Sequence, residues 1–179
     1  MIIGIVGSIA SGKDTVADYL KEKGFQAVSL SDMLREIMKQ ENIEITIPNM
    51  TEYGNKLRNS KGNGFLAQKA YESINKDKAI LTSIRQVGEV EFLKSKPDFY
   101  LIKLDAPIED RLKRLVKRDR DGDVKNLEEL KVIEAKQADG KGGDMNMNKC
   151  FEMADYTIIN DGNFEDLYKK VDELIAKLK

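Results

Sequence analysis

The segment with the clearest chemical pattern lies near the N-terminus, where small residues precede a lysine. Its sequence is Gly7-Ser8-Ile9-Ala10-Ser11-Gly12-Lys13-Asp14-Thr15. Small residues let successive backbone N–H groups curl around a polyphosphate, and a lysine at this spacing reaches the outer phosphoryl oxygens. The pattern predicts that residues 7–15 bind ATP and that Lys13 stabilises charge during catalysis.

The metal side of this pattern is irregular. In the usual loop a hydroxyl residue directly follows the lysine and holds Mg²⁺, whereas here Asp14 intervenes and Thr15 follows. An aspartate at the end of a neighbouring strand usually assists, but the corresponding position is Thr82. Thr15 is expected to meet Mg²⁺, and the assisting acid is either absent or supplied by Asp14, Asp32 or a more distant carboxylate.

Several segments resemble those of one enzyme family. The Gly-Lys-x-Thr form of residues 12–15 is the form used by adenylate kinases, and residues 31–35 (Ser-Asp-Met-Leu-Arg) resemble the segment that opens their acceptor site. Residues 154–162 look like the last strand and turn of dephospho-coenzyme A kinases. The chain therefore resembles the P-loop nucleoside monophosphate kinases and their relatives over nearly its whole length. The resemblance implies ATP and Mg²⁺ as cofactors and a small, nucleotide-like acceptor.

This resemblance also implies an acceptor side. Arg35, Arg58 and Arg85 would hold the acceptor phosphate, because a guanidinium binds phosphate through two parallel hydrogen bonds. Asp32 would orient an acceptor hydroxyl or a Mg²⁺-bound water, as a catalytic group. The alternative is that Asp32 caps a helix and that Arg35 and Arg58 are solvated helix charges.

A basic lid is the other part that the resemblance implies. Arg118 would stabilise charge in the transition state and Arg120 would contact the donor, because a mobile basic segment can supply charge once both substrates are bound. Arg114 would stack on a nucleobase or support the structure. Asn160, in the turn after the last strand, would lie near the donor adenine, and Gly140–Gly143 would be a hinge.

Other charged residues are expected to be surface groups. Glu89 and Glu91 lie on the helix that follows Arg85, where a solvated face is the simpler interpretation. Arg111 fits a solvated helix stabilised by pairs of charges three or four residues apart.

The elements that must position these residues follow from the hydrophobic pattern. Short apolar runs alternate with amphipathic stretches, which is typical of β–α–β units and a parallel sheet. Strands are expected at residues 2–6, 27–30, 79–82, 100–104 and 156–159. Helices are expected at residues 32–40 with Ser31 as N-cap, 48–60, 65–74, 87–94 and 127–138, and also after the loop, after Pro107 and after Asn163.

These elements predict a three-layer α/β/α fold of the P-loop NTPase type, with a parallel five-stranded sheet. The 179 residues suit one domain. The expected core comprises residues 1–31, 76–116 and 149–179. An acceptor-binding insertion is expected at 32–75 and a lid at 117–148.

Composition removes several alternative chemistries. The chain has no histidine, which excludes Ser-His-Asp and Cys-His catalysis and imidazole metal sites. A single cysteine, Cys150, excludes an intrachain disulfide and suits the reducing cytoplasm. Thirty basic against 31 acidic residues give a net charge of −1, which disfavours a nucleic-acid or membrane partner.

The sequence thus predicts a kinase that transfers the γ-phosphoryl group of ATP to a nucleoside or deoxynucleoside monophosphate. Dephospho-coenzyme A is the alternative acceptor. A nucleotide-binding regulatory protein is the alternative outside the enzyme class, and Thr82 and Asp14 are the residues that favour it.

Overall fold

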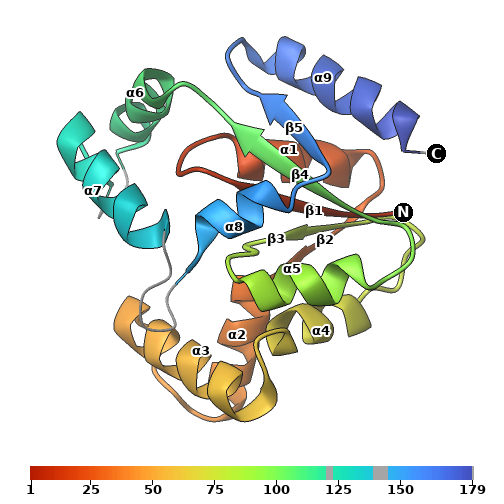
Figure 1. Cartoon of the computed structure of the whole chain (residues 1–179), viewed down its shortest axis with the longest axis vertical. Helices are drawn as coiled ribbons and strands as arrows, with labels where there is room; N and C mark the ends of the chain where they lie inside the picture. The colour runs from red at the N-terminus through yellow and green to blue at the C-terminus, as the bar shows by residue number, and fades with distance from the viewer. Residues whose placement is uncertain (120–122, 139–144, 179) are drawn as a thin grey trace.

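A five-stranded parallel sheet lies at the centre of the protein (Figure 1). The computed structural model describes residues 1–119, 123–138 and 145–178. The strands are β1 (Ile2–Gly7), β2 (Gln26–Ser29), β3 (Ala79–Thr82), β4 (Phe99–Asp105) and β5 (Tyr156–Ile159). They are ordered β2-β3-β1-β4-β5, and every neighbouring pair is parallel. The carboxyl ends of all strands therefore meet at one edge, where open α/β sheets bind ligands.

Helices connect and cover the strands. They are α1 (Lys13–Glu22), α2 (Leu30–Gln40), α3 (Ile47–Lys61), α4 (Phe65–Glu72), α5 (Val87–Lys94), α6 (Ile108–Arg118), α7 (Leu127–Ala138), α8 (Met147–Glu152) and α9 (Phe164–Lys177). The sheet and its covering helices confirm the three-layer fold expected from the sequence.

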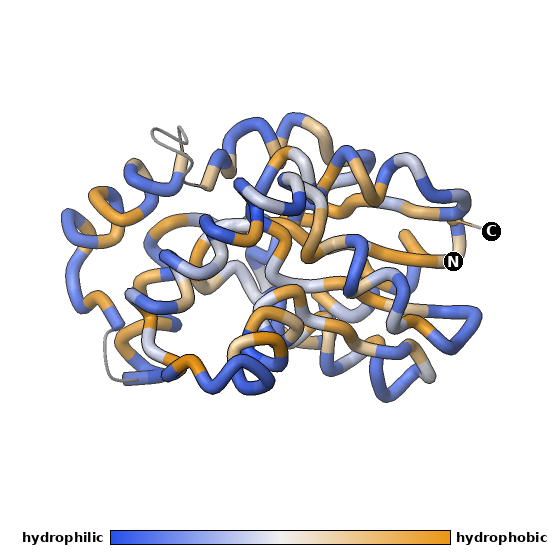
Figure 2. The backbone as a smooth tube through the Cα atoms, turned by 90° about the horizontal axis from the view of Figure 1, so that it is seen from below, coloured by the Kyte–Doolittle hydropathy of each residue, from blue (hydrophilic) through white to orange (hydrophobic). Residues whose placement is uncertain are grey.

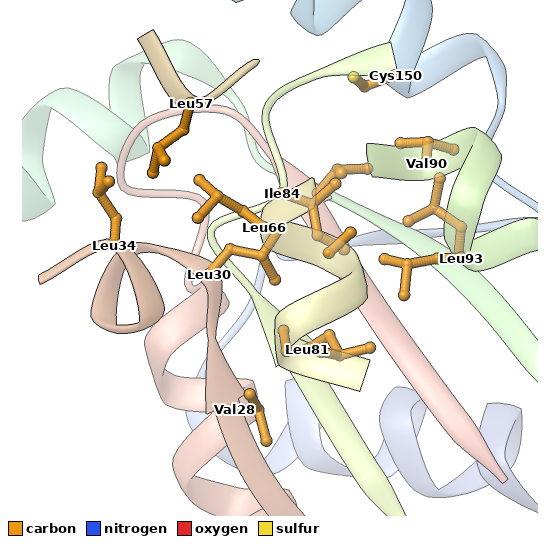
Figure 3. Close-up of a cluster of buried hydrophobic side chains, with 14 of the residues drawn as sticks. Val28, Leu30, Leu34, Leu57, Leu66, Leu81, Ile84, Val90, Leu93 and Cys150 are labelled. Atoms are coloured by element: carbon orange, nitrogen blue, oxygen red, sulfur yellow. The ribbon is translucent and has the colours of Figure 1, made fainter. Parts of the chain in front are cut away.

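Each face of the sheet has its own hydrophobic cluster. On one face α1 and α9 pack against the strands, with Leu20 and Val171 among the buried side chains. On the other face the cluster includes Leu34 of α2, Leu57 of α3 and Leu66 of α4, whose side chains gather above the sheet in Figure 3. Burial on both faces explains why β1 and β3 are nearly continuous apolar runs. The run of β1 is visible as the orange tube next to the N-terminus in Figure 2.

Two excursions from this core flank the carboxyl edge of the sheet (Figure 1). Helices α2, α3 and α4 connect β2 to β3, within the segment expected to bind the acceptor. Helices α6 and α7 follow β4 and share a small cluster in which Leu115, Val124 and Leu130 are buried and Ile9 of the phosphate loop is packed against them. Helices α6 and α7 are thus attached to the phosphate loop by apolar contacts.

Two expected details of secondary structure are wrong. The N-cap of α2 is Ser29 rather than Ser31, because Ser29 is extended at φ −109° and its hydroxyl accepts the Asp32 N–H. Helix α8 is absent from the expected elements, since its six residues are too few to show a hydrophobic period. Arg120 and Gly140–Gly143 lie outside the described residues. No helix within the described ranges is long and apolar enough to span a bilayer.

Candidate functional site

The phosphate loop turns tightly between β1 and α1. Gly12 has φ 103°, in the left-handed region that favours glycine, and a Cβ there would lie 2.5 Å from Asn160 Nδ2. A Cβ on Gly7 would lie 2.1 Å from the carbonyl oxygen of Leu104. Because Gly12 has no side chain to cap α1, the first N–H groups of that helix are available to an anion.

Lys13 is folded back over this loop. Its Nζ donates hydrogen bonds to the carbonyl oxygens of Gly7, at 2.8 Å, and Ser8, at 2.6 Å. Burial lowers the pKa of Lys13 to about 8, with the charge of Asp14 opposing that effect. The ammonium group is therefore mostly charged at neutral pH and lies where a polyphosphate would be cradled.

Side chains from other elements support the loop. Asn160, buried after β5, donates from Nδ2 to the Ser11 carbonyl at 2.8 Å. Arg114 of α6 donates to the Ala10 carbonyl at 3.2 Å and to the Asn160 carbonyl at 3.0 Å. Both predicted donor-side residues thus contact the loop, and the contacts of Arg114 favour the supporting role over base stacking.

Arg111 is the residue that the sequence interpretation misplaced on this side. It is buried, with 6% of its surface exposed, rather than solvated. Its guanidinium donates to the carbonyl oxygens of Ala106, at 2.9 Å, and Ile9, at 3.2 Å, and forms a two-bond ion pair with Glu134 of α7. Helix periodicity around Arg111 gives no sign of these partners, because all of them come from other segments.

A cavity of about 570 Å³ lies in front of the phosphate loop. The loop lines it together with Thr15, Arg118, Asn160 and the exposed ring of Phe164. Asp14 and Asp18 also line it. We call it the donor cavity; of the predicted donor-side residues it brings together residues 10–15, Arg118 and Asn160, whereas Gly7, Ser8 and Ile9 do not line it.

A second cavity, of about 350 Å³, lies between α2, α3 and the start of α5. Arg35, Arg58 and Arg85 all line this acceptor cavity, as predicted, alongside apolar side chains such as Leu34 and Leu66. Asp32 is absent from its described lining. The carboxylate of Asp32 is instead exposed and paired with Arg35 at 2.6 Å.

A third cavity, of about 250 Å³, shares lining residues with each of the other two. This junction cavity is lined by Lys13, Asp14 and Arg118, which also line the donor cavity, and by Arg85, which also lines the acceptor cavity. Thr82 lines it as well. Three cationic side chains from different elements therefore surround the region between the two larger cavities.

Arg118 reaches this region from the end of α6. Its Nε donates to Asp123 Oδ2 at 2.8 Å, and its Nη2 contacts the other oxygen of the same carboxylate. This hydrogen bond is the main cause that raises the pKa of Arg118. The pair fixes the guanidinium beside the donor and junction cavities.

Glu89 is a residue of the acceptor cavity that the sequence interpretation missed. Only 3% of its surface is exposed, so the expectation of a surface residue is wrong. Its Oε2 accepts the backbone N–H groups of Arg85, at 2.9 Å, and Gln86, at 3.1 Å. A capping-box pattern, with glutamate as third residue of α5 after Gln86, was the available signal.

These residues fit a nucleoside triphosphate with Mg²⁺. The loop has the uncapped helix start, the ammonium group and the close-packed glycines that a polyphosphate requires. No group of three or more acidic or thiol side chains that could hold a metal exists among the described residues. Mg²⁺ bound to phosphates needs only one or two protein ligands, and Thr15 and Asp14 of the donor cavity can supply them.

The packing at Gly7 gives a prediction about stability. Gly7→Ala should lower the free energy of unfolding by about 3 kcal/mol, because the new methyl overlaps backbone and either it or β4 must move. Gly24→Ala, with φ 90° but open space around it, is the control and should cost about 1 kcal/mol. Urea denaturation followed by circular dichroism measures both values, and equal losses would contradict the overlap.

The chain is similar to known proteins both in sequence and in fold. A family model described as an AAA domain matches residues 6–131. A UPF0200/UPF0201 protein of Archaeoglobus fulgidus is 32% identical and covers 99% of the chain, which spans 55% of that relative's length. A UPF0200 protein of Methanothrix thermoacetophila is 30% identical, over 99% of this chain and 97% of that protein.

Solved structures share the fold. Shikimate kinase from Acinetobacter baumannii, in complex with shikimate, superimposes with a TM-score of 0.61 at 23% identity, over 99% of this chain and 94% of that chain. Dephospho-CoA kinase from Campylobacter jejuni gives a TM-score of 0.57 at 17% identity, over 99% of this chain and 96% of that chain. At these identities the likeness concerns the fold.

Proposed function

Since the chain belongs to the AAA domain and UPF0200 families and has the fold of P-loop kinases, we propose that it is an ATP-dependent kinase. It transfers the γ-phosphoryl group to a small, nucleotide-like acceptor. The observation that carries this proposal is the junction cavity, where Lys13 and Arg118 of the donor cavity meet Arg85 of the acceptor cavity. A loop that only bound a nucleotide would not need a second basic cavity beside it.

The donor side binds and orients ATP. The loop N–H groups and Lys13 bind the β- and γ-phosphoryl oxygens. Arg118 neutralises charge that spreads over the oxygens during transfer. Thr15 and Asp14 would hold Mg²⁺, since Asp14 lines the donor and junction cavities whereas Asp32 lines neither and is paired with Arg35. Mg²⁺ supplies further charge neutralisation when bound.

The acceptor side holds an anion. Arg35, Arg58 and Arg85 bind the acceptor phosphate and hold the attacking oxygen toward the junction cavity. The apolar part of the lining packs against the rest of the acceptor. In this scheme residues 32–75 are the acceptor-binding insertion and residues 117–148 are the lid. The partners are small molecules of the cytoplasm. The near-zero net charge favours them over nucleic acid.

One assay tests the proposal. Purified protein, ATP and Mg²⁺ are mixed with AMP, GMP, CMP, UMP, dTMP or dephospho-coenzyme A, and ADP formation is followed against reactions without acceptor. Acceptor-dependent ADP formation with a monophosphate supports the proposal. Turnover of dephospho-coenzyme A alone would replace the proposed acceptor. Tight ATP binding without transfer to any of the six would favour a nucleotide-binding regulator instead.

A further inference from the structure

Glu89 sits in the acceptor cavity as a carboxylate among arginines. The described lining contains Arg35, Arg58 and Arg85 but no other acidic side chain. Burying a carboxylate is costly unless it is compensated. The capping of α5 alone does not require this burial, because capping-box glutamates act at exposed helix ends as well. The carboxylate is therefore placed to act on a ligand in the cavity that it lines.

The carboxylate is held in a fixed orientation. Both hydrogen bonds that the described residues give to Glu89 reach Oε2, from the N–H groups of Arg85 and Gln86. They close the turn after β3, in which Ser83 takes the unusual φ of 62° and its hydroxyl lies 3.3 Å from that of Ser29. With Oε2 occupied in this rigid turn, Oε1 is the oxygen available to a ligand in the cavity.

We propose that Glu89 determines acceptor specificity by accepting a hydrogen bond from an N–H or O–H group of the acceptor. This inference rests on the proposed function. It describes an acceptor with two chemically different ends. Its anionic end binds Arg35, Arg58 and Arg85, and its donor group, on the base or sugar of a nucleotide, binds Glu89 Oε1. A buried site built around one acceptor oxygen rejects analogues that lack the donor, because the carboxylate is then left unpaired.

The charge of Glu89 gives this role a pH dependence. Burial raises the pKa of Glu89 to about 7, against the opposing effect of the Arg85 and Gln86 N–H groups and of the Arg58 and Arg85 charges. Among neighbouring elements, α8 brings the Cys150 thiol, whose pKa is raised by burial and by the Glu89 charge to about 12. A carboxylate that must be ionised to accept a donor binds better as the pH rises through about 7.

Glu89→Gln is the decisive variant. Glutamine retains an oxygen for the N–H groups of the turn, so the cap survives, but it loses the negative charge and presents an NH₂ group where an oxygen is free. Glu91→Gln, on the exposed side of the same helix, is the matched control. Kinetics are measured for the best monophosphate of the panel above, at fixed ATP and then at varied ATP.

We expect Glu89→Gln to raise the acceptor KM at least tenfold at pH 8, with the ATP KM within twofold of wild type and Glu91→Gln unchanged. In wild type the acceptor kcat/KM should rise between pH 6 and pH 8, and in Glu89→Gln it should not. An unchanged acceptor KM, or an equal rise in both KM values, would overturn the role of Glu89 while leaving the kinase proposal standing. Absence of transfer to every acceptor would overturn both.

Discussion

Replacing Lys13 with alanine is expected to reduce phosphoryl transfer by about 10³-fold or more. The variant removes the ammonium group that lines both the donor and the junction cavity, so charge on the transferring group is left without a partner there. ATP affinity should fall as well, because the backbone N–H groups of the loop would bind the phosphates alone. Steady-state ADP formation and calorimetric titration with ATP measure the two effects.

The matched control for this variant is Lys21→Ala, which removes an exposed lysine from the same helix and should leave both values unchanged. Thermal unfolding of the variant checks that loss of the hydrogen bonds to Gly7 and Ser8 has not unfolded the loop. The pKa of Lys13 is about 8, so its ammonium group loses its positive charge as the pH rises above that value. The ATP affinity of the wild type should therefore fall above pH 8. Wild-type transfer by the alanine variant would remove Lys13 from the mechanism.

Arg118→Ala should have the second largest effect, a fall in kcat of about 10² to 10³-fold with a much smaller change in the ATP KM. The reason is that charge spreads over the phosphoryl oxygens only during transfer, so a guanidinium at the junction cavity binds the transition state more strongly than the ground state. Rapid-mix single-turnover measurements separate this loss from slow product release.

Two variants sharpen that test. Lys117→Ala, at the neighbouring exposed position of α6, should retain the wild-type rate, and Arg118→Lys should recover part of the loss because it restores charge without the two-pronged geometry. An ATP KM that rises as much as kcat falls would instead assign Arg118 to simple donor binding.

Much of this fold was predictable because its cues are local. The strand of β3, the helix of α7 and the loop at Lys13 each depend on a few consecutive residues, and their predicted bounds are close to those found. The parallel five-stranded sheet was expected from the resemblance to P-loop kinases, and the structure and the fold shared with solved kinases confirm it.

The buried charges could not be predicted in the same way. Arg111 and Glu89 occupy helix positions that look solvated when only their own helices are considered. Arg111 is buried because Ile9, Ala106 and Glu134 converge on it from three segments. The hydrogen bonds of Glu89 are local and belong to the capping box with Gln86, but the cavity around it is lined by residues of α2 and α3. The partners of Arg111 and the burial of Glu89 therefore depend on packing between segments, which the hydrophobic period of one helix does not report.

The structure supports the predicted roles of some catalytic and binding residues more than those of others. The proposed roles require cavities that adjoin one another, and the three cavities do share lining residues. They are lined by Lys13, Arg118, Arg35, Arg58 and Arg85. Asp32 does not line the described cavities and pairs with Arg35. This pairing favours a role for Asp32 in orienting Arg35 over direct contact between Asp32 and the acceptor. Thr82 lines the junction cavity but has no carboxylate. Asp14 is therefore the acidic residue that would bind Mg²⁺ in the proposed scheme.

The three partners of Arg111 also bear on how such a protein can change over evolutionary time. Glu134 lies on a helix far along the chain from the phosphate loop, yet one guanidinium connects the two directly. A substitution at Glu134 would leave a buried positive charge unpaired beside the loop backbone. If the loop binds ATP as proposed, donor affinity should therefore be adjustable by mutation in α7, at a position that does not line the donor cavity, while the loop sequence itself stays the same.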